Sequence, residues 1–154
     1  MIQIGYFQYL PKFLDVKENL NEVKRLLKQN KKKINTLDLL IFPEYFLSGP
    51  LTLDFMVEYE KKISSKQIKV LLSQISKNYP KVTFIMGSVL LKQEGRYFNT
   101  SLAIKNGKIL AEYHKKALIY NENYICQSDN KQAVFKVKDI RVGLAICWDI
   151  ILPE

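Results

Sequence analysis

The hydrophobic and polar positions of the chain follow two different periods, which together predict both strands and helices. Residues 2–9 (IQIGYFQY) alternate well enough for a strand. Asp15 then opens an amphipathic helix, whose apolar face is formed by Val16, Leu20, Val23, Leu26 and Leu27. A second amphipathic helix is predicted over 65–78, and Tyr79-Pro80 ends it. These segments predict helices that each bury one face.

Several apolar runs between and after the helices predict further strands. Residues 37–42 (LDLLIF) form a short continuous run that is typical of a buried parallel strand, and Pro43 ends it. Residues 82–91 (VTFIMGSVLL) form the next one. The order strand, helix, strand, helix indicates an α/β fold.

Two hairpins complete the pattern. Asn106-Gly107 joins 99–104 to 108–113 and suits a type I′ turn, which needs positive φ angles. A second hairpin is predicted from 133–137 and 140–147. We therefore expect a mixed β-sheet with helices on one face. No repeat or linker divides the chain, so residues 1–154 are expected to form a single domain.

The composition narrows the class of protein. Of the 154 residues, 47% are hydrophobic and 25% are charged, as in a globular domain. Two cysteines, no recognisable signal peptide and no apolar run near 18 residues favour the cytoplasm and argue against a membrane partner. The formal charge of +9 raises the question of nucleic-acid binding, but the densest lysine cluster (24–33) ends a helix, where cations normally face water. We expect no nucleic-acid partner.

Three residues near predicted strand ends are candidates for chemistry. Glu44 directly follows the strand 37–42, at an edge where ligands bind in open α/β sheets. Lys115 lies at the end of the first hairpin, where a cation can stabilise an oxyanion and favour a nearby thiolate. Cys147 precedes Trp148-Asp149, which resembles a sharp turn that presents a nucleophile. Each residue alone is also compatible with an ordinary surface charge or a small buried side chain.

Other candidates are weaker. A Cys147–His114 dyad is the alternative nucleophile scheme, but strand alternation turns His114 away from the face that carries Lys115. Cys126 lies in a polar segment and is interpreted as incidental. The chain has one histidine and no metal-ligand spacing, so neither a metal nor a cofactor is expected.

Together these segments resemble the nitrilase, or carbon-nitrogen hydrolase, superfamily. The segment DLLIFPEYFLSG is similar to its glutamate motif, YHKKAL to its lysine motif and CWDIILPE to its nucleophile motif. The resemblance implies the catalytic triad Glu44, Lys115 and Cys147, with the backbone amide of Trp148 in the oxyanion site. It also implies an auxiliary role for Glu122, although the register there is off by one and the family's glycine is absent. Ala117 departs from the pattern too, because the family commonly has His there.

The resemblance covers the whole chain but only about half of the family domain. It implies the N-terminal half of a four-layer αββα sandwich, so we expect an apparently truncated domain. The implied function is hydrolysis of non-peptide carbon-nitrogen bonds in a small-molecule amide, carbamoyl or nitrile substrate, through a cysteine thioester. An N-acyltransferase using the same triad and a non-catalytic remnant or binding subunit are the alternatives. A full-length form is expected to be a homo-oligomer.

Overall fold

The structure is a computed structural model that describes residues 1–50 and 56–151. Its helices are α1 (Val16–Gln29), α2 (Lys31–Ile34), α3 (Met56–Lys62), α4 (Ser65–Lys77) and α5 (Glu122–Ile125), with a 3₁₀ helix, η2, at Cys147–Ile150. Its strands are β1 (Ile4–Tyr6), β2 (Leu39–Ile41), β3 (Thr83–Gln93), β4 (Arg96–Lys105), β5 (Lys108–His114), β6 (Val134–Val137) and β7 (Ile140–Gly143). None of the helices within these residues is both long and apolar enough to cross a membrane.

The two long helices begin at residues whose side chains cap them. In α1, Asp15 Oδ1 accepts a hydrogen bond from the backbone N–H of Glu18 at 3.1 Å. In α4, Ser64 and Gln67 form a reciprocal capping box. A cap of this kind contributes about 1 kcal/mol by satisfying an amide that has no partner within the helix. Both amphipathic helices predicted from the sequence are confirmed.

The main sheet has five strands in the order β1-β2-β3-β4-β5. Strands β1, β2 and β3 are parallel, while β3-β4 and β4-β5 pair antiparallel. Between β4 and β5, Asn106 and Gly107 have φ angles of 46° and 79°, as a type I′ turn requires. The predicted mixed sheet and its first hairpin are therefore confirmed.

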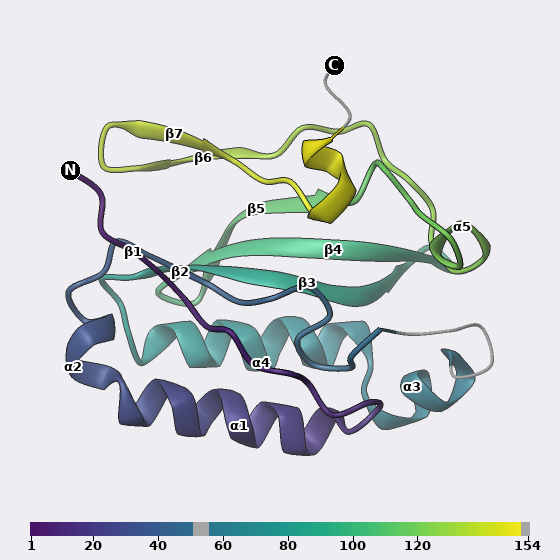
Figure 1. Cartoon of the computed structure of the whole chain (residues 1–154), viewed down its shortest axis with the longest axis horizontal. Helices are drawn as coiled ribbons and strands as arrows, with labels where there is room; N and C mark the ends of the chain where they lie inside the picture. Colours follow the sequence, from purple (N-terminus) through teal and green to yellow (C-terminus); the bar gives the residue numbers. More distant parts are fainter. Residues whose placement is uncertain (51–55, 152–154) are drawn as a thin grey trace.

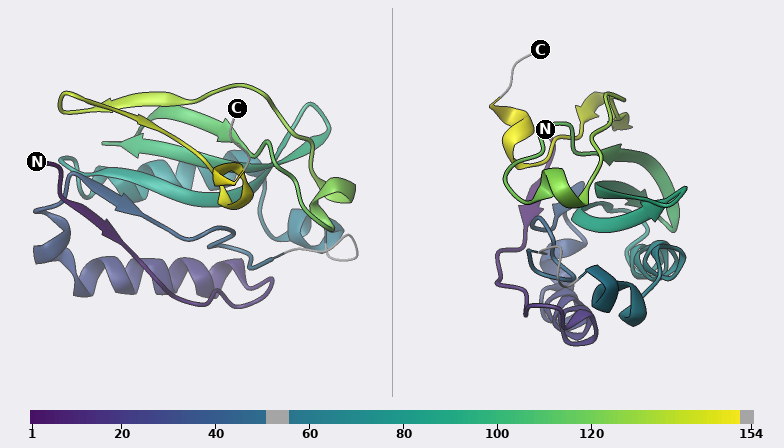
Figure 2. Two further views of the ribbon diagram at one scale, coloured as in Figure 1. Left: turned by 45° about the horizontal axis from the view of Figure 1, so that its top comes forward. Right: turned by 90° about the vertical axis from the view of Figure 1, so that its right-hand side faces the viewer.

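The elements form three layers (Figures 1 and 2). Helices α1 and α4 cover one face of the main sheet, and the β6-β7 hairpin covers part of the other face. Apolar residues fill both interfaces. The larger core includes Val23, Ile68 and Phe84, and the smaller one is formed by Leu39, Ala103, Phe135 and Val137. The sequence pattern did not separate the second hairpin from the main sheet, because alternation specifies which side of a strand is buried but not its partner.

Several boundaries differ from the predicted ones. Strand β1 is shorter than 2–9, because residues after Tyr6 leave the sheet and run along α1, where Lys12 N donates to Asn19 Oδ1 at 2.7 Å. Strand β7 ends at Gly143 rather than at Cys147. The short helices α2, α3 and α5 were not predicted, since a helix of one or two turns leaves little periodic signal.

Candidate active site

The strand directions bring the predicted residues to one edge of the main sheet. Strand β5 runs in the same direction as β2, because β3 is parallel to β2 and two antiparallel pairings separate β3 from β5. Glu44 follows β2 and Lys115 follows β5, so both come from carboxyl ends at the same edge. Asn99, near the start of the antiparallel strand β4, joins them there. The topology thus explains why residues distant in sequence meet.

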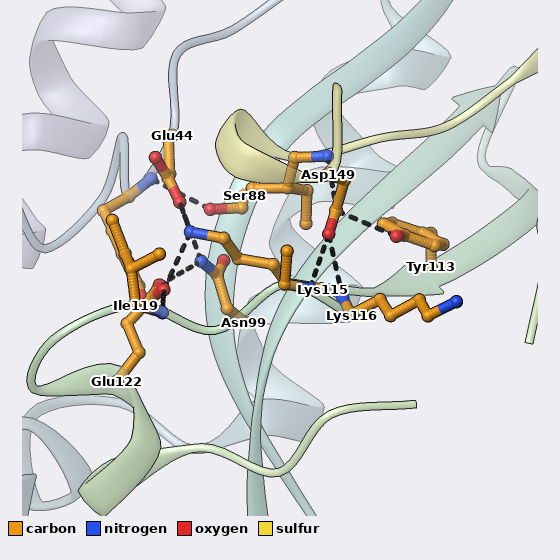
Figure 3. Close-up of polar contacts among 12 residues, drawn as sticks. Glu44, Ser88, Asn99, Tyr113, Lys115, Lys116, Ile119, Glu122 and Asp149 are labelled. Atoms are coloured by element: carbon orange, nitrogen blue, oxygen red, sulfur yellow. Dashed lines mark hydrogen bonds and ion pairs between the residues drawn. The ribbon is translucent and has the colours of Figure 1, made fainter. Parts of the chain in front are cut away.

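The centre of the site is the ammonium group of Lys115 (Figure 3). Its Nζ donates to Glu44 Oε1 at 3.0 Å and to Glu122 Oε2 at 2.8 Å. The Lys115 side chain is 1% exposed, while those of Glu44 and Glu122 are 31% and 13% exposed. Burying a charge is unfavourable unless it is paired, and here two carboxylates surround one cation. The cluster carries one net negative charge when all three groups are ionised.

Asn99 connects the two carboxylates. Its Nδ2 donates to Glu44 Oε1 and to Glu122 Oε1, each at 2.9 Å. Its backbone carbonyl accepts the amide of Lys115, also at 2.9 Å. Asn99 was not among the site residues predicted from the sequence. Its position in the first hairpin was visible, but its contact with Glu44 depends on how the strands are ordered.

Glu122 has more hydrogen-bond partners than a surface acid would have. Besides Lys115 and Asn99, the Tyr45 hydroxyl donates to its Oε1 at 2.8 Å and the Ile119 amide to its Oε2 at 3.1 Å. Burial alone would raise the pKa of Glu122, but these donors, Lys115 first, outweigh it and lower the pKa. The carboxylate predicted as auxiliary therefore lies in the centre of the cluster.

Burial and charge also compete at Lys115. Burial by itself lowers the pKa of the ammonium, whereas hydrogen bonds and charges from Glu122 and Glu44 raise it. The net effect is a raised pKa, so Lys115 stays protonated at neutral pH. The arrangement supplies a fixed positive charge inside the sheet edge, as oxyanion stabilisation requires.

The loop that carries Glu44 is held close to strand β3. Ser88 Oγ accepts the backbone amide of Tyr45 at 3.1 Å, and the Ser88 amide donates to the Pro43 carbonyl at 3.3 Å. Gly87 lies in an irregularity of β3, and a Cβ atom there would collide with the carbonyl oxygens of Phe42 and Pro43. Gly87 thus permits the close approach that fixes the Glu44 backbone.

Cys147 occupies a sharp turn, as predicted, although the turn is a 3₁₀ helix that follows a short non-strand segment. Its φ angle is 51°, in the left-handed region that side chains other than glycine rarely adopt. The exposed Cys147 lies close enough to Glu44, to Lys115 and to the Trp148 amide for all three to affect the pKa of its thiol. The structure therefore brings together Glu44, Lys115 and Cys147.

One expectation about Cys147 is corrected. We expected Lys115 to favour its thiolate, but burial, followed by the charge of Glu44, raises the pKa of the thiol. Lys115 and the backbone amide of Trp148 act in the opposite direction and do not outweigh those effects. The raised pKa favours a neutral thiol for Cys147 at neutral pH.

His114 lies in a different cluster from Cys147. Its Nδ1 is 2.9 Å from the Thr100 hydroxyl, and its ring packs on Phe98 with centroids 4.4 Å apart. Burial lowers the pKa of His114. The alternation that turned His114 away from Lys115 in the sequence analysis is observed.

Cys126 lies closer to the site than its sequence context indicated. It is buried, and burial followed by the charge of Glu122 raises its pKa to about 12. Within residues 1–50 and 56–151, no three His, Cys, Asp or Glu side chains are grouped as metal ligands would be. Pro153-Glu154, at the end of the quoted nucleophile motif, lies outside the described residues.

Two curated proteins are similar to this chain in sequence. The chain is 29% identical over 117 residues to an (R)-stereoselective amidase of Pseudomonas sp., covering 76% of this chain and 42% of the amidase. It is 30% identical over 120 residues to a glutamine-dependent NAD(+) synthetase of Thermotoga maritima, covering 75% of this chain and 20% of that protein. The chain thus spans less than half the length of these two relatives.

Solved structures show the same fold. A CN-hydrolase superfamily protein of Xanthomonas campestris matches with a TM-score of 0.84 at 22% identity, over 99% of this chain and 55% of that one. An amidase variant of Nesterenkonia sp. AN1, with the acetamide moiety of fluoroacetamide added covalently at its active-site cysteine, matches with a TM-score of 0.80 at 18% identity, over 97% and 56%. The sequence model of the family described as carbon-nitrogen hydrolase matches residues 3–154. The chain therefore belongs to the carbon-nitrogen hydrolase family, and its fold is a partial nitrilase-superfamily fold.

Proposed function

We propose that the protein hydrolyses a small primary carboxamide through a thioester on Cys147. The observation that carries this proposal is the convergence of three groups at one sheet edge. Glu44 lies near enough to Cys147 for its charge to raise the pKa of the thiol. The same carboxylate accepts a hydrogen bond from the buried Lys115 at 3.0 Å. A nucleophile, a proton acceptor and a fixed cation are the parts that acyl transfer requires.

The first step forms the thioester. Glu44 accepts the proton of the Cys147 thiol as the sulfur attacks the amide carbon, and the carbonyl oxygen gains negative charge. Lys115 and the backbone amide of Trp148 stabilise that oxygen, and each such donor typically contributes about 3 kcal/mol in the transition state. The carbon-nitrogen bond then breaks, and Glu44 returns the proton to the nitrogen, which leaves as ammonia.

The second step releases the acid. A water molecule attacks the thioester carbon while Glu44 accepts one of its protons. The carbon-sulfur bond breaks, the sulfur regains a proton from Glu44, and the carboxylic acid leaves. Water and amide become acid and ammonia with no change in oxidation state. In both steps, Glu122 and Asn99 hold Lys115 and Glu44 in place through their hydrogen bonds.

The class of substrate is proposed from the comparisons. One matching relative is named an amidase and another a glutamine-dependent enzyme, and the amide of glutamine is a primary carboxamide. The covalent acetamide adduct in the Nesterenkonia amidase variant shows that the active-site cysteine of that protein is a nucleophile toward an amide reagent. A relative that is 24% identical over 153 residues is named a probable nitrilase. We assign the amide as the substrate class because the two relatives with 29% and 30% identity have names that refer to amide or glutamine chemistry.

The test is ammonia release from simple amides by the full-length protein and its Cys147→Ala variant. We expect turnover in the wild type and none above background in the variant, with both proteins equally folded by circular dichroism. Cys126→Ala is the matched control, because that buried thiol takes no part in the proposed chemistry. Equal turnover by wild type and Cys147→Ala would reject the proposal.

A further inference from the structure

Asp149 lies two residues after Cys147 and connects the cysteine turn to the lysine segment (Figure 3). Its Oδ1 accepts the backbone amides of Lys116 at 3.1 Å and Ala117 at 2.7 Å, immediately after Lys115. These contacts join parts of the chain that are 33 and 32 positions apart. Asp149 Oδ1 therefore fixes the position of the Cys147 turn relative to the segment that follows Lys115.

The other oxygen of Asp149 holds the turn itself. Oδ2 accepts the amide of Ile146 at 2.9 Å and the hydroxyl of Tyr113 at 2.8 Å. Ile146 directly precedes Cys147, and Tyr113 is buried in strand β5. The carboxylate thus has four donors, two on each oxygen. The amide of Ile146 directly precedes Cys147, and the amides of Lys116 and Ala117 directly follow Lys115.

Within the turn, the backbone amides of Asp149 and Ile151 donate to the carbonyls of Ile146 and Trp148, but these bonds do not reach the Lys115 segment. Ile146 is buried, whereas Trp148 is 40% exposed and Ile150 is 78% exposed. Cys147 also adopts a positive φ angle, which persists only when the surroundings impose it. Charge-assisted hydrogen bonds to a carboxylate are roughly twice as strong as neutral ones, so Asp149 can supply this constraint.

We propose that Asp149 is a positioning residue that fixes the Cys147 sulfur against Glu44 and Lys115. The catalytic meaning of this inference rests on the proposed function, but the geometric claim does not. Asp149 touches neither the thiol nor the ammonium in the contacts above. It acts through the backbone on either side of them. A displacement of about 1 Å at a reacting group can reduce the rate by about 100-fold.

The experiment compares Asp149→Asn with wild type in the full-length protein. The amide has nearly the same shape, but its NH₂ group replaces one acceptor oxygen, so at least one backbone N–H loses its acceptor. We measure kcat and KM for a simple amide. We also measure the rate of iodoacetamide labelling at Cys147 against pH, with the labelled peptide identified by mass spectrometry. Asp139→Asn, in the exposed β6-β7 turn, is the matched control.

We expect Asp149→Asn to lower kcat by about 100-fold with KM little changed, because alignment rather than substrate affinity is lost. We also expect its labelling midpoint to move to lower pH, because the released thiol moves away from the Glu44 charge that raises its pKa. Asp139→Asn should leave both unchanged. Unchanged kcat and labelling in Asp149→Asn would overturn the inference, as would a lower unfolding temperature with an unmoved labelling profile.

A second variant, Tyr113→Phe, and the labelling assay cover the cases in which Asp149→Asn does not fold or the wild type has no amidase activity. If Asp149→Asn does not fold, Tyr113→Phe removes only the hydroxyl donor to Oδ2 and should shift kcat and labelling in the same direction by a smaller amount. An unshifted Tyr113→Phe would then overturn the inference. If the wild type releases no ammonia, the proposed function fails, while the labelling comparison still decides whether Asp149 positions Cys147.

Discussion

The Nζ atom of Lys115 lies 3.0 Å from Oε1 of Glu44, although the two residues are 71 positions apart in the sequence. The Lys115 side chain is 1% exposed, so its charge depends on its protein partners rather than on water. Glu122 provides the second partner at 2.8 Å. This buried pairing is the basis of both the stability and the proposed chemistry of the site.

Replacing the buried cation should destabilise the fold. Lys115→Met leaves Glu44 and Glu122 facing each other without a positive charge between them, and breaking a buried pair in this way costs about 3 to 5 kcal/mol. Urea unfolding at neutral pH measures the difference in free energy of unfolding. Lys136→Met, on an exposed position of β6, serves as the control and should change it little. A Lys115→Met protein as stable as Lys136→Met would contradict the assigned pairing.

The stability due to Glu122 should depend on pH in a defined direction. Its pKa is lowered in the folded state from the ordinary 4.5, so the stability linked to its ionisation is present above pH 4.5 and is lost as the pH falls through the lower folded pKa. We therefore expect wild type to exceed Glu122→Gln in unfolding free energy at pH 7, and the gap to narrow below pH 4.5. A gap that widens on acidification would show that the pKa is raised instead.

Gly87 should tolerate no side chain. In Gly87→Ala, the new methyl group meets the carbonyl oxygens of Phe42 and Pro43 and must push the Glu44 loop away. We expect a loss of about 1 to 3 kcal/mol in stability, as for other overpacked sites, together with reduced turnover. Gly143→Ala is the matched control, because a Cβ atom there meets open space. Thermal unfolding of both variants provides the comparison, and equal midpoints would argue against the close approach.

The charge of Glu44 should hold the Cys147 thiol in its protonated form. Because burial and the Glu44 charge together raise the pKa of the thiol, Glu44→Gln should lower it, and iodoacetamide labelling should reach its midpoint at lower pH than in wild type. Turnover should fall in the same variant, because its proton acceptor is gone. Labelling at lower pH together with slower turnover would distinguish the effect of the Glu44 charge on the thiol pKa from the role of Glu44 as proton acceptor. A midpoint that does not fall in Glu44→Gln would place the carboxylate away from the thiol.

The sequence predicted the long amphipathic helices and the hairpin with a characteristic turn. Asp15 and the apolar face of α1 mark a helix, and Asn106-Gly107 marks a hairpin, because each depends on residues close together in the chain. The strand that precedes Glu44 was also predicted, since a continuous apolar run ended by proline leaves few alternatives. The resemblance to a family supplied the order of the candidate residues.

The sequence did not predict the contacts that hold the site together. Asn99 bridges two carboxylates only because β4 lies between β3 and β5, which no local pattern specifies. Asp149 looks like an ordinary acid after a tryptophan until its four donors are located in space. The expected thiolate at Cys147 failed for a similar reason, because burial and the distance to Glu44 are three-dimensional properties.

Capture of the acyl thioester on Cys147 tests the proposed mechanism without relying on a change in rate. The full-length protein is incubated with an amide that it turns over, quenched in acid and digested, and the peptide containing Cys147 is examined by mass spectrometry. We expect a mass increase equal to the acyl group on Cys147, absent in Cys147→Ala and before substrate is added. Continued amide turnover with the acyl group on another residue, or with Cys147 never modified, would contradict it.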